Sequence, residues 1–388
     1  MPKRVNLEID ENPFQFKNKS LKMNKAFSEQ NYQSSTILTD DLFTYIDFFF
    51  SSHKKNMKYR DQSLKAKYGN PEKYHFAFYW KQSMAFYNAV KVLPIESSPL
   101  ASYYSMLNAV KALIAFREKY VDDFISDFSA HGLAEEKNAI GESLDTIGIK
   151  RYDFGVFVHF GKMLESNFVS EWPKNTPWTM KKLLYNLAYL HRAFVTTYTT
   201  PRGRKVPEQF LPIKAGSSPT YYKGNDSKLY LKFEIEKSHF APTVLSIPSS
   251  ILTAISSDFK LHKSEGFVIR STSGARRNSE SVSTDLKEMN SMLRKDFQYI
   301  KSSKRLWYLK ENSLGNSEII KTSSMLIEMA AMHRFSEIVR YKPEQLARLM
   351  DSKENWLVHE FLTLTLDQFI DEIAAEITGQ DIMCTGVK

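Results

Sequence analysis

Between residues 74 and 94 the pattern of apolar side chains is that of a helix with one broad buried face. Apolar and small residues recur three and four positions apart, at Phe76, Tyr79, Trp80, Ser83, Phe86, Tyr87 and Val90. This spacing follows the 3.6-residue period of an amphipathic helix. Pro94 ends the pattern, so we expect the helix to stop before it.

The next segment, residues 98–116, is predicted to be a helix that is buried on two sides. Ser98 and Pro99 suit the N-cap and the first helical position. One stripe is large and apolar, and a second is made of small residues that would let another helix approach: Ala101, Ser105, Asn108, Ala112 and Ala115. Asn108 and Lys111 lie in or beside this second stripe. The pattern is typical of the central helix of a bundle.

Helical periodicity returns at 178–194 and in the last seventy residues. A helix is expected with Met325, Leu326, Met329, His333, Ser336 and Val339 on one face, and Pro343 starts a new segment. Thr365 and Gln368 have the T-x-x-Q spacing of a capping box, and Gly379 supplies a stop, so a further helix is expected between them.

Alternation with a period of two appears only in the middle of the chain. In "LYLKFEI", residues 229–235, apolar and polar side chains alternate strictly, as in a half-buried strand. Residues 243–247 and 267–272 are its expected partners. A small sheet is therefore predicted at about 205–275.

Together these patterns predict a mainly α protein, a helical bundle with a small β-containing insertion. The expected parts are an N-terminal segment (1–73), the first part of a helical core (74–200), a basic β-containing insertion (201–310) and the C-terminal part of the core (311–388). The length of 388 residues fits two domains, or one domain with an insertion.

The composition indicates in which cellular compartment the protein is expected. Only one cysteine, Cys384, is present, which excludes a disulfide framework within one chain and fits a reducing cytoplasm. The first residues show no apolar core of a signal peptide, and no run of about 18 apolar residues occurs. We therefore expect a cytoplasmic protein without a membrane partner.

The net charge of +9 is unevenly distributed. Lys and Arg outnumber Asp and Glu by 20 to 10 over residues 201–310, and are outnumbered 7 to 13 after residue 310. A basic middle and an acidic end indicate either a surface for polyanions or docking against an acidic face of the same or another subunit.

Several kinds of catalytic site are excluded by motif. Neither G-x-x-x-x-G-K-[ST], nor G-x-G-x-x-G, nor G-x-S-x-G occurs. His359-Glu360 begins like a zinc-protease helix, but Thr363 stands where the second histidine is needed. His131 and Glu135 could hold a metal only with further ligands, and the alternative is that His131 orders the break at Gly132. No cofactor and no metal site are predicted.

Basic residues cluster in three loops that bracket the predicted sheet. Guanidinium and ammonium groups bind phosphate oxygens, so these loops are either ordinary solvated loops or nucleic-acid contacts. The candidate nucleic-acid-binding residues are Arg202, Arg204, Lys205, Arg276, Arg277, Lys304 and Arg305.

The segment "SYYSMLNAVKALIAF", followed by "SAHGL", resembles the central helix of HEPN-type helical domains. More narrowly, the chain resembles the YaaC-like family of bacterial proteins, through "FGVFVHFGKML", "WTMKKLLYNLAYLHRAF", "IVRYKPEQL" and "WLVHEFLTLTLDQFIDEIAAEI". These blocks follow in order over most of the chain from about Tyr74. The resemblance implies a cytoplasmic, HEPN-like helical core of the kind found in bacterial toxin and antiphage modules, which often pair as homodimers.

HEPN ribonucleases use an arginine followed, after four to six residues, by a histidine. The nearest pair here is Arg151 and His159, with seven residues between them, and Arg340 has no histidine downstream until His359. This departure favours a binding protein without catalysis. Asn108, Lys111, His131 and Arg340 are then interpreted as a polar seam of the bundle or as ligand contacts.

Three functions follow. The first is a nucleic-acid-binding accessory component of a bacterial defence or regulatory system. The second is a metal-independent ribonuclease with Arg151 and His159 as catalytic residues. The third is a subunit whose acidic C-terminal face binds a partner protein.

Overall fold

The computed structural model describes residues 7–52, 76–117, 130–136, 143–165, 167–174, 176–199, 209–262, 266–276, 282–311 and 319–387. The chain forms two units. Unit 1 consists of Met1–Leu38, Pro207–Ile319 and Gly379–Lys388, and unit 2 consists of Thr39–Val206 and Ile320–Thr378. Each unit is therefore assembled from segments that are far apart in the sequence.

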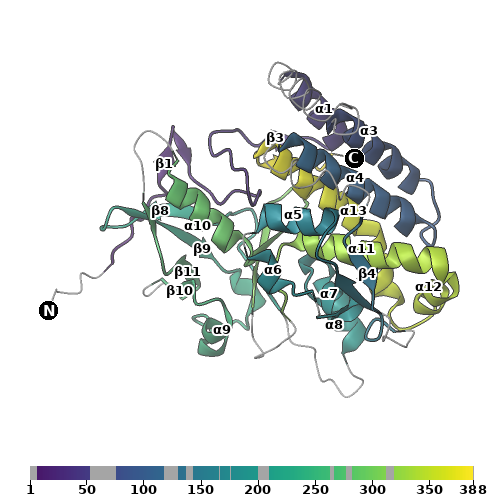
Figure 1. The fold of residues 1–388 in the computed structure, drawn as a ribbon. Coiled ribbons are helices and arrows are strands. Elements are labelled where there is room, and N and C mark those ends of the chain that lie inside the picture. The colour runs from purple at the N-terminus through teal and green to yellow at the C-terminus, as the bar shows by residue number, and fades with distance from the viewer. Residues whose placement is uncertain are drawn as a thin grey trace. The chain divides into compact units, whose positions relative to one another are not determined.

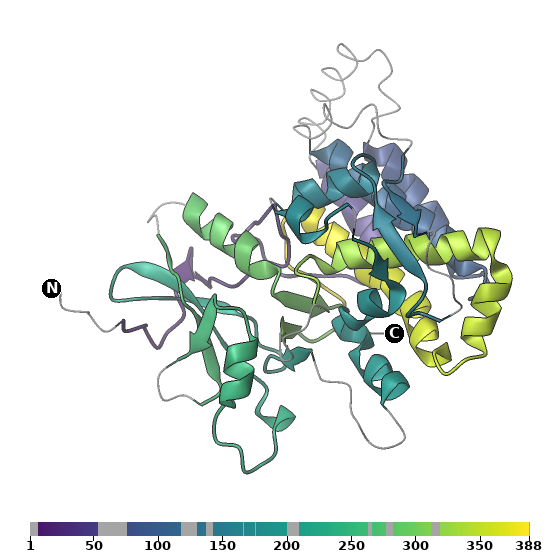
Figure 2. The same cartoon turned by 60° about the horizontal axis from the view of Figure 1, so that its bottom comes forward.

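Helix α4 (Ser98–Phe116) is the centre of unit 2. It packs against α3 (Phe76–Val90), α11 (Ser324–Tyr341) and α13 (Asn355–Thr378), and both ribbon views show this grouping (Figures 1 and 2). Small residues on α4 allow the close approach. Where α3 crosses α4, the hydroxyl groups of Ser83 and Ser105 each donate a hydrogen bond of 2.9 Å to the backbone carbonyl of the other residue.

Shorter elements surround these helices. An antiparallel sheet in the order β4-β5-β6 consists of Leu133–Glu135, Gly148–Arg151 and Trp178–Thr179. The other helices in the described part of unit 2 are α1 (Leu42–Ser52), α5 (Val156–Leu164), α6 (Phe168–Glu171), α7 (Met180–Tyr185), the 3-10 helix η4 (Ala188–Leu190), α8 (His191–Tyr198) and α12 (Pro343–Met350).

Unit 1 is built on two antiparallel sheets. In the larger one, β9 (Lys228–Glu234) pairs with β8 (Thr220–Lys223), β11 (Val268–Ser271) and β12 (Ala275–Arg276), and β10 (Phe259–Leu261) pairs with β11. The second has the order β13-β14-β7, with strands Phe297–Ile300, Leu306–Lys310 and Phe210–Pro212.

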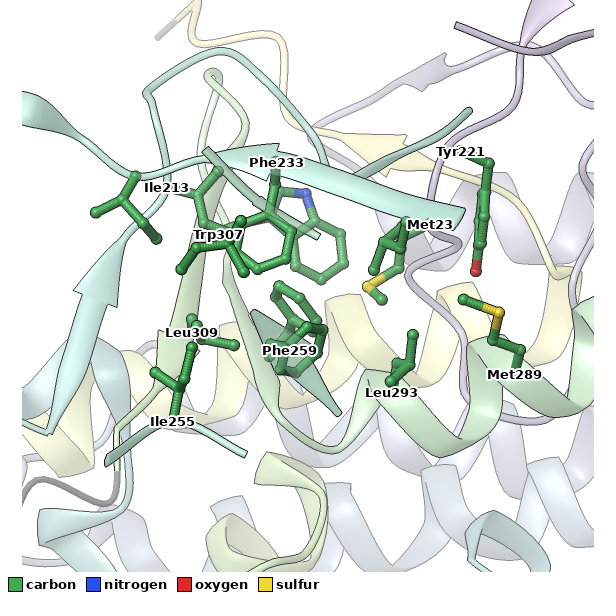
Figure 3. Packing of buried hydrophobic residues seen from close by; sticks show 14 of the residues in the cluster. Met23, Ile213, Tyr221, Phe233, Ile255, Phe259, Met289, Leu293, Trp307 and Leu309 are labelled. Carbon is green, nitrogen blue, oxygen red and sulfur yellow. The ribbon is translucent and has the colours of Figure 1, made fainter. Parts of the chain in front are cut away.

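The core of unit 1 lies between these sheets and α10 (Thr284–Arg294). Figure 3 shows Phe233, Phe259 and Trp307 packed together, with Met289 and Leu293 of α10 beside them. The other elements of unit 1 are β1 (Gln15–Phe16), β2 (Lys19–Ser20), β3 (Ile37–Leu38), η5 (Lys237–His239), α9 (Ser249–Ala254) and β15 (Ile382–Met383).

The N-terminal and C-terminal segments of unit 1 are joined to each other. Strands β3 and β15 pair in parallel, and the backbone carbonyl of Gly379 accepts hydrogen bonds from the Asn31 backbone and the Asn24 side chain, at 2.8 and 3.0 Å. Residues 21–23 in turn follow the edge of β8, where the Tyr221 amide donates to the Leu21 carbonyl at 2.8 Å.

The predicted fold class, a mainly α HEPN-like bundle with one small β insertion, is wrong. Helices make up 46% and strands 17% of the structure, and the described residues contain five sheets. Strands of two to four residues are too short to show an alternating pattern, and many pair with partners far away in the sequence. The sheets therefore extend beyond the predicted range of 205–275, to residues 15–38, 133–151 and 297–310.

At the level of single elements the outcome is mixed. The strands predicted at 229–235 and 267–272 are confirmed as β9 and β11, whereas residues 243–247 form no strand. The helix predicted at 178–194 is interrupted at Asn186, whose side chain oxygen accepts a 2.9 Å hydrogen bond from the Ile320 amide. No helix in the described part of the chain is long and apolar enough to cross a membrane.

Candidate functional site

In unit 1, the described residues form a pocket of about 430 Å³. Its wall comes from β2 and the segment between β2 and β3, from Ser218 before β8, from residues 305–307 at the start of β14, and from Asp381. Three cationic side chains, Lys19, Lys22 and Arg305, share this wall with one carboxylate, Asp381. The pocket thus carries a surplus of positive charge.

Arg305 is held in place by the C-terminal segment. Its guanidinium forms an ion pair with Asp381 and donates a 2.8 Å hydrogen bond to the Thr36 hydroxyl. The Thr36 hydroxyl also donates to Asp381, at 3.1 Å. These contacts among Arg305, Thr36 and Asp381 order the guanidinium before a ligand binds, which lowers the entropy cost of binding.

Lys22 lies in the same pocket, and the positive charge of Arg305 acts on it. Partial desolvation, together with this charge, lowers the pKa of the Lys22 ammonium, while Asp381 acts in the opposite direction. Two cations that repel each other in one pocket gain stabilisation when an anion binds between them.

The remaining wall is rich in hydroxyl groups and amides. Ser20, Ser34, Ser35 and Ser218 contribute hydroxyls, and the Lys19 ammonium donates to the Ser35 hydroxyl at 3.1 Å. Met23 and Trp307 also line the pocket, and both belong to the hydrophobic core drawn in Figure 3. The chemistry of the wall suits a ligand with several negatively charged oxygens.

Only some of the predicted nucleic-acid-binding residues lie in or beside the pocket. Arg305 lines the pocket and Lys304 beside it is exposed, whereas Arg276 is 85% exposed and 3.9 Å from Asp285. Arg202, Arg204, Lys205 and Arg277 lie outside the described residues. Sequence reasoning missed Lys19, Lys22 and Asp381. These residues belong to no recognisable motif, and only the folded chain brings them close to Arg305.

The candidate catalytic arginine has a structural role. Arg151 is 4% exposed, its Nε donates to the Trp172 carbonyl, and its Nη1 donates to the Tyr152 carbonyl at 2.9 Å. His159 lies half-buried on α5. The buried guanidinium is thus bound to backbone carbonyls, and the catalytic role of Arg151 and His159 stays a prediction.

The predicted polar seam is partly assembled in unit 2. The Asn108 amide donates to the Tyr104 carbonyl of its own helix at 2.8 Å. His131 lies against α4, where its Nδ1 is 2.6 Å from the Tyr103 hydroxyl and the two rings stack at 5.3 Å. Burial and the nearby charges of Lys111 and Arg340 lower the pKa of His131.

A second histidine of this cluster was not predicted. His333 on α11 is 3% exposed and meets the Tyr103 ring edge-on at 4.8 Å. Its Nδ1 is 3.7 Å from the Glu337 carboxylate. Burial, with the charges of His131, Arg340 and Arg334, places the pKa of His333 well below its ordinary value.

This burial predicts a loss of stability at acidic pH. The unfolded chain binds a proton on His333 near pH 6.5, and the folded chain does not, so the free energy of unfolding falls as the pH falls. When the pH falls from 6.5 to 5.5, we expect the free energy of unfolding of the wild-type protein to decrease by about 1 kcal/mol more than that of His333→Gln. Urea unfolding at both pH values measures this difference, and equal losses would contradict it.

Among the described residues, no group of three or more His, Cys, Asp or Glu side chains could hold a metal ion. This statement includes His131 and Glu135, whose carboxylate instead pairs with Arg334 and Lys342 at 2.6 and 2.7 Å. The pocket of unit 1 is therefore the best-supported binding site of the structure.

Comparison with known proteins identifies one family. The model of the YaaC-like protein family matches residues 26–377, which is most of the chain. A search of curated proteins and a search of solved structures each returned no match.

Proposed function

We propose that this chain, which belongs to the YaaC-like family, is a nucleic-acid-binding protein that holds a phosphate group in the pocket of unit 1. The observation that carries the proposal is the convergence of Lys19, Lys22 and Arg305 on one cavity. Three cations face one carboxylate there, so the site attracts anions. The single cysteine fits a cytoplasmic location for this activity.

Arginine and lysine contribute differently to such a site. The planar Arg305 guanidinium is oriented by Asp381 and Thr36, which both accept from its Nη2, and its Nη1 group can donate to a phosphate oxygen. Lys22 and Lys19 add compact charges on flexible stems. Exposed cations near the pocket, above all Lys304, can extend contact along a nucleic-acid backbone.

Binding without turnover is the activity this chemistry favours. Among the residues that line the pocket in the described structure there is neither a histidine nor a cysteine. Those residue types supply most nucleophiles and general bases that work near neutral pH. An accessory role in a defence or regulatory system is consistent with binding alone.

The proposal predicts that reversing one pocket charge weakens binding to any sequence. Fluorescence anisotropy with labelled single-stranded RNA and DNA should show at least a tenfold loss for Lys22→Glu, with a shallower dependence of affinity on salt. Lys22 is exposed, so the change leaves the core intact. Lys287→Glu, an equal charge change at an exposed position on α10 outside the pocket, is the matched control.

Two outcomes would reject nucleic-acid binding at this pocket. One is undetectable or salt-independent binding by the wild-type chain. The other is an equal loss of affinity in Lys22→Glu and Lys287→Glu, because a pocket site cannot respond identically to a charge outside it.

The opposite change should strengthen binding. Asp381→Asn removes the one carboxylate among the described residues of the pocket wall while keeping an oxygen that can accept from Arg305 and Thr36. We expect the affinity for the same oligonucleotides to rise about threefold, since less negative charge opposes the phosphate. Unchanged or weaker binding in the same anisotropy assay, with the fold intact by circular dichroism, would contradict this.

A further inference from the structure

We infer that the pocket of unit 1 binds the terminal phosphate monoester of a single strand, with its one attached nucleotide, rather than the backbone of a continuous strand. This inference rests on the proposed function and specifies its ligand. It follows from the size of the cavity, its charge and the kinds of donor groups that face it.

The cavity has the size of a small-molecule site. Its volume of about 430 Å³ lies near the lower end of the range in which proteins hold compact ligands, about 300 to 1,000 Å³. A groove that follows a strand would need cationic groups spaced along several nucleotides. Here the three cations lie in the wall of a single cavity.

The charge of the pocket matches a monoester better than a diester. A phosphate monoester carries about −1.5 to −2 charges at pH 7 and offers three terminal oxygens. An internal diester carries one negative charge. Lys19, Lys22 and Arg305 exceed Asp381 by two positive charges, and all three cations belong to the wall of the same cavity.

Neutral donors surround the cations. The hydroxyls of Ser20 and Ser35 and the amide of Asn31 belong to the same wall. Such groups can donate to phosphate oxygens that remain after the cations have bound, and they can bind the hydroxyls of an attached ribose. The side chain of Tyr32, which is partly buried in the wall, offers an aromatic surface for a base.

The wall is rigid enough to be selective. Asn24 donates to the Gly379 carbonyl, the Ile37 amide donates to the Asp381 carbonyl at 2.9 Å, and Lys25 donates to the Ile382 carbonyl at 3.0 Å. These bonds join the two chain segments that form the pocket. A preformed site of this kind binds a ligand weakly when that ligand leaves polar groups of the site without hydrogen-bond partners.

The test compares ligands that differ only in a terminal phosphate. Isothermal titration of the full chain with adenosine, adenosine 5′-monophosphate and adenosine 3′-monophosphate should show at least tenfold tighter binding of one monophosphate than of adenosine. A ten-nucleotide RNA with that terminal phosphate should bind at least tenfold tighter than the same RNA without it. Lys22→Met should abolish both preferences, and Lys287→Met should retain them.

The outcomes separate this inference from the proposed function. RNA that binds equally with and without terminal phosphates, together with monophosphates that bind no better than adenosine, overturns the inference while nucleic-acid binding stands. Monophosphates that bind tightly, with no binding of any oligonucleotide, support the monoester site and reject the proposed function. Preferences that persist in Lys22→Met place the phosphate elsewhere and overturn the inference.

Discussion

Replacing Arg294 with methionine is expected to lower the free energy of unfolding of unit 1 by about 3 to 5 kcal/mol. The Arg294 side chain is completely buried, and its guanidinium lies 4.4 Å from the Phe27 ring centroid and 4.9 Å from that of Trp307. It donates to the carbonyls of Lys25 and Phe297, at 2.9 and 2.7 Å. Methionine fills much of the space but leaves both buried carbonyls without these donors.

The measurement must resolve unit 1. Hydrogen exchange in increasing urea, followed by mass spectrometry of peptides from β13 and from residues 21–30, reports the stability of this region. Arg294→Lys keeps the charge but cannot reproduce the planar, two-sided contact, so we expect an intermediate loss. A loss below about 1 kcal/mol for Arg294→Met would show that this guanidinium does not hold the N-terminal segment in unit 1.

Replacing Gly155 with alanine is expected to destabilise unit 2 by at least 3 kcal/mol. Gly155 has φ of +105°, and a Cβ at this position would lie 2.6 Å from the backbone nitrogen of Gly132. Neither backbone can move away freely, because the amides of Val156 and Phe157 donate to the carbonyls of Ala130 and His131 at 2.9 and 3.0 Å. The substitution thus pushes directly on the chain that presents His131 to Tyr103.

Gly216→Ala is the matched control for this experiment. Gly216 also has a positive φ, +80°, but a Cβ there would meet no atom within 4 Å. It therefore measures backbone strain alone, which costs about 1 kcal/mol. Urea denaturation followed by circular dichroism compares the two variants, and equal losses would contradict the steric explanation.

The sequence predicted the structure well where a hydrophobic pattern continues over a long, uninterrupted element. Helices α3, α4 and α11 are continuous, and their periodicity could be recognised directly. The prediction failed where a residue has a tertiary role. Thr365 and Gln368 lie in the interior of α13, where Thr365 pairs with the Tyr189 hydroxyl at 2.8 Å and Gln368 donates to Glu372 at 2.6 Å. Their capping-box spacing was therefore misleading.

The same distinction explains the family and the fold. The resemblance to the YaaC-like family is confirmed over residues 26–377, since it used ordered blocks along the chain. The HEPN-like bundle inferred with it is not supported. The two-residue strands β3 and β15 pair across more than three hundred residues, and neither has a pattern long enough to predict that pairing.

For the candidate site, sequence reasoning could identify Arg305 but not its surroundings. Arg305 belongs to a visible cluster of basic residues, "KSSKR". Lys22 and Asp381 reach it only because the N-terminal and C-terminal segments join in unit 1. A cluster of basic residues in the sequence can belong to a solvated loop or to the wall of a pocket. Only the fold distinguishes these two cases.

The most direct test of the phosphate pocket is photo-crosslinking of the full chain to a short RNA with photoreactive bases at both ends and a phosphate at the end preferred in the titrations. Mass spectrometry of the crosslinked peptides should identify residues 19–36 or 305–307, and Lys22→Glu should abolish these crosslinks while Lys287→Glu retains them. Crosslinks found only in unit 2, or crosslinks in unit 1 that persist unchanged in Lys22→Glu, would contradict a phosphate site formed by Lys19, Lys22 and Arg305.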